Sequence, residues 1–216
     1  MPSLSSGPSL ARRERHALCD LALALGPDAP TLCGGWDVAD LVAHLLVREN
    51  RPLGAVGIAV PALSGMADRE MAKVARQDFP VLVEKLRDPG LTPYAIKPLE
   101  RLLNTLEFFV HHEDLRRAQP GWEPRSLSAA DQRRLWTAIR GGGRLAVRKA
   151  GVPVRIARSD VPGESATLRR GADPVTVSGP PSELVLFLFG RDRTRGLELD
   201  GPPESVARLH TAEKGF

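Results

Sequence analysis

The stretch NTLEFFVHHEDLRRA, residues 104–118, has the pattern of one helix with two separate polar stripes. Successive residues of an α-helix are rotated by about 100°, so the adjacent histidines of this stretch point in different directions. The first stripe is expected to face solvent; its members are Arg101, Thr105, His112 and Arg116. The second stripe lies between apolar residues; its members are Glu100, Asn104, Glu107, His111 and Asp114. An inner polar stripe of this kind indicates a polar cavity among packed helices.

A second helix is predicted within GGWDVADLVAHLLVREN, residues 34–50. Asp37 is expected to cap the start of this helix, and Trp36 is expected to pack against Leu41 across the first turn. Aliphatic residues surround His44 in this segment, so the imidazole is expected to be largely buried.

Other helical patterns complete an N-terminal group of four. They end at Gly or Pro signals, and they cover residues 10–25, 67–86 and about 99–119. Helices with short or moderate connections pack as bundles. A further helix is expected over residues 128–149, interrupted by the three glycines at 141–143.

Beyond Gly151 the apolar pattern changes from a helical period to the alternation that is typical of strands. A hairpin is predicted from two such segments around a Pro-Gly turn, residues 152–160 and 164–170. Short strands and helices then alternate over residues 174–180, 180–191, 196–202 and 202–213. We therefore predict an α+β fold, with a four-helix bundle over residues 1–150 and a small α/β domain over residues 151–216.

The composition is that of an ordinary soluble protein, with 216 residues, 42% hydrophobic, 26% charged and a net charge of +4. The arginines are scattered and no stretch approaches the roughly 20 apolar residues that cross a bilayer, so neither nucleic acid nor a membrane is expected as a partner. Two cysteines and the lack of a signal-peptide pattern favour a reducing, cytoplasmic setting. We expect a monomer or a weak homodimer.

Glu107 and His111 lie one helical turn apart, so both side chains can reach one ion. The same spacing also occurs in surface pairs and in buried hydrogen-bonded pairs, so it does not identify metal ligands by itself. His44 is the candidate third ligand, because metal sites in bundles are built from facing helices. Two imidazoles and one carboxylate leave coordination positions open, a pattern that is typical of catalytic divalent-metal sites.

Three other residues lie near these candidates in the sequence. Asp114 is one turn beyond His111 and is expected to orient this histidine, to act as a general base, or to form a surface salt bridge. Asp40 stands similarly before His44, where helix capping is the simpler interpretation. Cys33 precedes the second helix, whose dipole would activate a thiol, but a small buried loop residue is the favoured interpretation.

Two segments, GGWDVADLVAHL (residues 34–45) and LEFFVHHEDLRRA (residues 106–118), resemble the mycothiol-dependent maleylpyruvate isomerase family, a branch of the DinB/YfiT-like metal-binding superfamily. More narrowly, they are similar to an uncharacterised actinobacterial subgroup of it. The resemblance implies a DinB-like bundle in which His44, Glu107 and His111 are the metal ligands.

The C-terminal segment SGPPSELVLFLFGR, residues 178–191, is similar to the α/β unit of the same family, which is related to sterol-carrier-like folds. The resemblance implies a divalent ion, most simply Zn²⁺, with mycothiol as a possible cosubstrate. Such an ion would activate the thiol for attack on a small electrophile, giving isomerisation or S-transfer. Two other interpretations stay open: a metal-dependent hydrolase that uses no thiol, and a metal-binding protein without catalysis.

Overall fold

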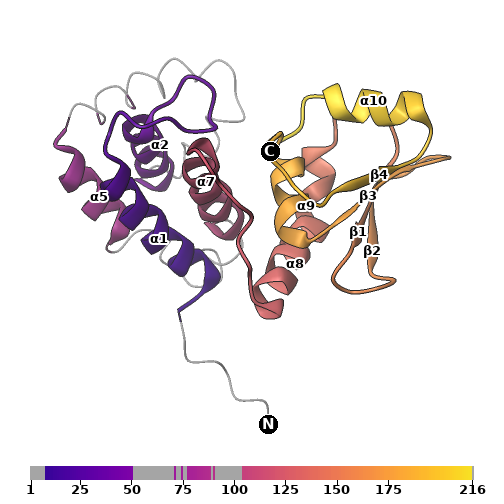
Figure 1. Cartoon of the computed structure of the whole chain (residues 1–216), viewed down its shortest axis with the longest axis horizontal. Helices are drawn as coiled ribbons and strands as arrows, with labels where there is room; N and C mark the ends of the chain where they lie inside the picture. Colours follow the sequence, from indigo (N-terminus) through magenta and orange to yellow (C-terminus); the bar gives the residue numbers. More distant parts are fainter. Residues whose placement is uncertain are drawn as a thin grey trace, which may run out of the picture. The chain divides into compact units, whose positions relative to one another are not determined.

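The computed structural model describes residues 8–50, 71, 74, 77–88, 90 and 104–215 (Figure 1). Its contacts divide the chain into two compact units, Met1–Glu123 and Pro124–Phe216. The described part of the first unit is helical apart from its loops, and the second unit combines helices with a four-stranded sheet. The fold is therefore mixed α+β.

Local signals in the sequence set the ends of the first two helices. α1 (Leu10–Leu25) begins after Ser9, whose hydroxyl accepts a backbone N–H of the first turn. It ends at Gly26, whose φ of 86° favours glycine. α2 (Val38–Asn50) begins after Asp37, whose carboxylate accepts a backbone N–H at 2.9 Å. The structure confirms both predicted helices and the predicted capping role of this aspartate.

Two further described helices belong to this unit, α5 (Phe79–Arg87) and α7 (Thr105–Ala118). α1 packs against both of them, and α2 packs against α5. α5 coincides with the C-terminal part of the helix expected over residues 67–86, but Gln77 and Asp78 before it are not helical, so the expected helix is interrupted there. Residues 67–70, 72, 73, 75 and 76 lie outside the described residues. α7 is the helix expected from the opening stretch, and its first described residue is the N-cap Asn104.

One apolar core joins these helices. Its largest fully buried members come from all four, and they include Leu18, Leu41, Leu45, Leu82, Leu86, Phe108 and Leu115. Burial of each such side chain contributes roughly 1.5–3 kcal/mol, so this cluster fixes how the helices lie against one another.

α7 is buried on nearly all sides, which contradicts the solvent face expected for one of its polar stripes. Thr105 and His112 are each 6% exposed, whereas Arg116 is partly exposed. Arg101 lies outside the described residues. The expectation about His112 was wrong because α1 packs against α7 and brings Glu14 to this imidazole.

The second unit contains a sheet and three helices. Its elements are α8 (Ala129–Ala146), β1 (Val154–Arg158), β2 (Ser165–Arg169), β3 (Val175–Gly179), α9 (Pro181–Leu188), β4 (Glu198–Asp200) and α10 (Pro203–Thr211). The strand order is β2-β1-β3-β4, with β1 antiparallel to β2 and parallel to β3. The structure confirms the predicted hairpin and the order of the strands and helices after it.

α9 is the central helix of this unit, because every one of its residues is buried. It packs against α8 and β3, and Figure 1 shows α8 and α9 together on one face of the sheet. A helix that is apolar all round needs such cover on several sides.

α8 runs through the three glycines at 141–143 without the expected interruption. A Cβ atom at Gly143 would lie 3.0 Å from the side chain of Leu168 on β2, so glycine lets this helix approach the sheet closely. α8 thus belongs to the second unit, and the expected domain boundary near residue 150 is corrected to a division after Glu123.

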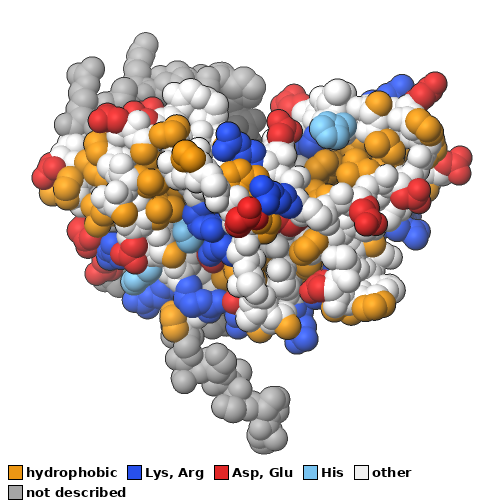
Figure 2. Space-filling view, in the orientation of Figure 1, with side chains coloured by type: hydrophobic (Ala, Val, Ile, Leu, Met, Phe, Trp, Pro, Cys, Tyr) orange, Lys and Arg blue, Asp and Glu red, His pale blue; other side chains and the backbone are white. Residues whose placement is uncertain are grey.

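The surface carries no obvious single-sign face in the view of Figure 2, where acidic and basic side chains are interspersed over both units. None of the helices in the described ranges is long and apolar enough to span a bilayer.

Candidate metal centre

The candidate ligands come together at the contact of α2 with α7. His44 on α2 lies between two rings: its centroid is 5.0 Å from that of Trp36 and 5.5 Å from that of His111. The rings of the two histidines are inclined at 71°, so they meet edge to face. Trp36, which was expected to pack against Leu41, thus lies beside the imidazole of His44.

His44, Glu107 and His111 each offer a ligand atom within 4.8 Å of the others. Within this group, Nε2 of His111 lies 3.5 Å from Oε2 of Glu107. Glu107 keeps 22% of its side chain exposed, while the imidazole of His111 is 10% exposed. The three residues predicted as ligands are thus neighbours in space, and their donor atoms are of the types that divalent zinc takes.

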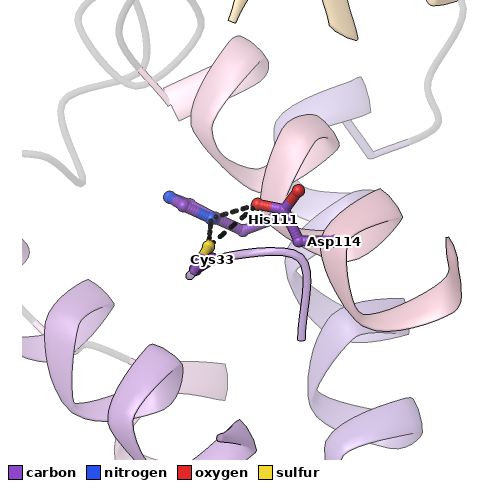
Figure 3. A group of neighbouring side chains, drawn as sticks. All are labelled: Cys33, His111 and Asp114. Carbon is purple, nitrogen blue, oxygen red and sulfur yellow. Dashed lines mark hydrogen bonds and ion pairs between the residues drawn. The ribbon is translucent and has the colours of Figure 1, made fainter. Parts of the chain in front are cut away.

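The other nitrogen of His111 faces a different pair of residues (Figure 3). Nδ1 lies 2.9 Å from Oδ2 of Asp114, whose side chain is fully buried. The thiol of Cys33 donates to the same oxygen at 3.2 Å, and its sulfur lies 3.7 Å from Nδ1. An ionised carboxylate can only accept hydrogen bonds, so next to an ionised Asp114 the donor is Nδ1, and Nε2 is then on the side of Glu107.

The loop that carries Cys33 is held against α7 by its backbone. The N–H of Leu32 donates to the backbone oxygen of Asp114 at 3.2 Å. Within the loop, the N–H of Cys33 donates to the Thr31 hydroxyl at 3.1 Å, and the N–H of Trp36 donates to the Cys33 carbonyl at 2.9 Å. The sulfur position is therefore fixed by several hydrogen bonds on both sides of the residue.

The electrostatics suit metal binding at His44 and at Glu107, whereas His111 has to release a proton before it can act as a ligand. Burial and the charge of His111 lower the pKa of His44 to about 4, so this ring is neutral near pH 7. Burial would raise the pKa of Glu107, but its hydrogen bond with His111 and the charge of Arg48 outweigh burial and lower it to about 2. Burial also opposes charge on His111, yet its hydrogen bonds, first that with Asp114, raise the pKa of this ring well above its usual value.

A chain of buried polar side chains continues from the site into the unit. Nε of Arg48 lies 3.6 Å from Oε2 of Glu107, and its Nη1 donates to Oδ1 of Asn104 at 3.0 Å. The Asn104 amide donates to Glu49 at 3.4 Å, and Glu49 pairs with the buried Arg15. Arg48 thus connects a candidate ligand, through Asn104, to the Arg15–Glu49 ion pair that joins α1 and α2.

His112 has no place in this site. Its Nδ1 lies 2.7 Å from Oε2 of Glu14, and both side chains are buried. The adjacent histidines of α7 therefore serve two separate contacts, as predicted, although His112 contacts α1 rather than solvent.

Sequence reasoning missed two features of this region. Arg48 lies one helical turn after His44, and this spacing is a signal that could have identified it. The contact of Cys33 with His111 and Asp114 joins residues that are distant in the chain, and no local pattern links them. The favoured interpretation of Cys33, a small buried loop residue, is correct about the loop, but the residue is only partly buried and has these partners, which the interpretation omits.

Solved structures with this fold include a mycothiol-dependent maleylpyruvate isomerase, which is 18% identical with a TM-score of 0.58. A histidine-to-alanine mutant described under the same name is 17% identical with a TM-score of 0.60. Each comparison covers 88% of this chain and 90% of the other. No curated protein sequence matches the chain.

The family comparison is more specific than the fold comparison. The model of the mycothiol maleylpyruvate isomerase N-terminal domain matches residues 11–170, which include every candidate ligand and both strands of the hairpin of the second unit. This match spans more than half of the sequence. The chain therefore belongs to the mycothiol maleylpyruvate isomerase N-terminal domain family.

Proposed function

We propose that the N-terminal unit is a DinB-like four-helix bundle that holds a divalent ion through His44, Glu107 and His111. The observation that carries this proposal is the grouping of the three donors, from two helices, within 4.8 Å of one another. Two imidazoles and one carboxylate match a catalytic zinc site, in which coordination positions are left for substrate. The neutral ring of His44 and the ionised Glu107 are both in the state that binds a cation.

The residues around the ligands have distinct roles in this proposal. Asp114 accepts the Nδ1 hydrogen of His111 and thereby directs Nε2 to the ion. The hydrogen bond with His111 and the charge of Arg48 keep Glu107 ionised, and Asn104 accepts a hydrogen bond from Arg48. When bound here, a divalent ion lowers the pKa of a coordinated thiol or water, which makes a nucleophile available near neutral pH.

The proposed reaction is the thiol-dependent isomerisation of a small electrophile, with mycothiol as the thiol. Membership of the family supports mycothiol as the thiol, and the grouping of the three donors supports a bound divalent ion. A thiolate that adds to a conjugated double bond converts it to a single bond, about which the carbon skeleton can rotate. Departure of the thiol then restores the double bond and gives the isomer, whereas a retained thiol would give an S-transfer product.

The metal proposal is tested by elemental analysis of protein purified without added metal. We expect about one divalent ion, most simply Zn²⁺, per chain in the wild type. This ion should be lost in His44→Ala, Glu107→Ala and His111→Ala. His112→Ala is the matched control, because it removes the neighbouring imidazole of the same helix and should keep the ion. Metal-free wild type, or equal metal content in all four variants, would reject the site.

The thiol proposal is tested on the metal-loaded protein by thermal unfolding with mycothiol. Binding at a hundredfold excess over Kd stabilises a protein by about 2.7 kcal/mol, so a clear upward shift is expected. The His44→Ala variant should show no shift, because the thiol has no ion to coordinate. A loaded wild type that is unaffected by mycothiol would reject thiol dependence and leave the metal site standing.

A further inference from the structure

The residues on the Nδ1 side of His111 have a second use that goes beyond orientation of the ring. Cys33, His111 and Asp114 each offer a ligand atom, and these atoms lie within 4.8 Å of one another. They supply a thiol, an imidazole and a carboxylate, a donor set in which the thiolate favours soft divalent ions. Figure 3 shows the three donor atoms converging on one point between the loop and α7.

The spacing of these donors is close to that around a tetrahedral ion. From bond lengths of about 2.0–2.3 Å, neighbouring donors of such an ion lie about 3.3–3.6 Å apart. The observed separations are 3.7 Å for sulfur to Nδ1, 3.2 Å for sulfur to Oδ2 and 2.9 Å for Nδ1 to Oδ2. Small movements of the side chains would therefore admit an ion, while the backbone bonds of the loop keep the sulfur in position.

We infer that Cys33, His111 and Asp114 form a second, thiolate-containing metal site, which competes with the His44–Glu107–His111 site for the imidazole of His111. The competition rests on the proposed function, because it requires the first site to bind an ion. The thiolate site itself does not. A neutral imidazole has one lone pair, so His111 can bind one ion at Nε2 or one ion at Nδ1.

The two carboxylates exchange roles between the two states. With an ion at Nε2, the ring hydrogen lies on Nδ1 and is accepted by Asp114, as the 2.9 Å separation shows. With an ion at Nδ1, the ring hydrogen lies on Nε2, where Oε2 of Glu107 is 3.5 Å away. The Cys33 thiol loses its proton to solvent in the second state, and the charges balance as the sulfur becomes a thiolate ligand.

Ligand chemistry decides which site a given ion takes. The first site offers only nitrogen and oxygen and suits borderline or harder ions, whereas thiolate ligands favour soft ions. A soft ion such as Cd²⁺ should therefore bind at Cys33 and remove His111 from the first site. The ion at the first site would then be released, although His44, Glu107 and His111 are all still present in the chain.

Cadmium titration of the metal-free full chain tests the site directly. We expect an ultraviolet thiolate-to-cadmium charge-transfer band that saturates at one equivalent. Cys33→Ser should abolish this band while it keeps a hydroxyl to donate to Asp114, which preserves the local hydrogen bond. Cys19→Ala is the matched control, since it removes the other cysteine thiol, which lies outside this cluster, and the band should persist. A wild type without the band, or a band that survives in Cys33→Ser, would overturn the inference.

Competition with zinc separates this inference from the proposed function. In the wild type with excess of both metals, we expect cadmium and zinc together to total one ion per chain. His44→Ala should bind no zinc at the first site but keep the cadmium band. Simultaneous binding of one cadmium ion and one zinc ion per chain would show that the two sites do not compete for His111. If zinc binds through His44 but cadmium gives no band, the thiolate site is refuted and the proposed function stands. If cadmium gives the band but the chain binds no zinc through His44, the proposed function is refuted and the thiolate site stands.

Discussion

Replacement of His112 by alanine tests whether this histidine contributes to the stability of the fold and not to metal binding. The imidazole is 6% exposed and lies 2.7 Å from the Glu14 carboxylate, which is 4% exposed. A hydrogen bond to a charged group contributes about 1.5–3 kcal/mol, and loss of the buried ring adds a packing term. We therefore expect His112→Ala to lower the free energy of unfolding by about 3 kcal/mol, or the melting temperature by roughly 10 °C.

The measurement is urea unfolding of the metal-free protein, so that metal binding does not add to stability. A double-mutant cycle with Glu14→Ala should give a coupling energy above about 1 kcal/mol, because the two side chains share one contact. The metal content of His112→Ala should equal that of the wild type. A loss below about 0.5 kcal/mol, as for a surface residue, would refute the buried pair. Loss of the ion would refute the separation of the two histidines.

Three other predictions concern the stability and reactivity of the chain. Arg15→Ala should cost about 3–5 kcal/mol in urea unfolding, because Glu49 is 1% exposed and loses its ion-pair partner; a loss under about 1 kcal/mol would contradict this. Gly141→Ala should stabilise α8 by up to about 1 kcal/mol, because nothing lies within 4 Å of the added methyl group. Gly143→Ala should not stabilise it, because the added methyl group would lie 3.0 Å from Leu168; equal effects of the two substitutions in thermal unfolding would contradict this prediction. Burial raises the pKa of Cys19 to about 12, so iodoacetamide at about pH 8 should leave this thiol unmodified until urea is added, as peptide mass spectrometry can check.

The local features of this chain could be predicted because their causes are local. The helix over residues 10–25 has its cap and its terminal glycine within the segment, and α1 has these bounds. The hairpin of β1 and β2 follows from alternation on both sides of one turn. The grouping of His44, Glu107 and His111 followed from helical spacing together with the family resemblance, and these residues do lie together.

The failures involve contacts that the local pattern does not encode. His112 lies on a stripe with Thr105 and Arg116 that has the pattern of a solvent face. In the structure Glu14 on α1 pairs with His112, which is buried, while Arg116 is partly exposed. Buried ion pairs look like surface residues in a sequence, because their partners are distant in the chain. The glycines at 141–143 signal a break, but α8 continues through them, and at Gly143 the missing side chain lets the helix approach β2.

The pairing of α1 with α7 has a consequence for how the protein folds during synthesis. The two helices lie at opposite ends of the first unit's sequence, so they can meet only after the intervening chain has been made. Contacts between distant segments form slowly, because a long loop must close before they stabilise anything. Until then, α1 exposes Glu14 without the imidazole that pairs with it.

A nascent chain that ends at Asp88 would contain α1, α2 and α5 but lack the helix that covers their polar side chains. We expect such a fragment to unfold without cooperativity and to be cleaved rapidly by proteases, whereas a chain extended through Glu123 should fold and resist them. Cooperative unfolding of the shorter fragment would show that the first three described helices hold together without α7. The proposed metal site would be the last part of the unit to be completed, because Glu107 and His111, two of its three proposed ligands, lie on α7.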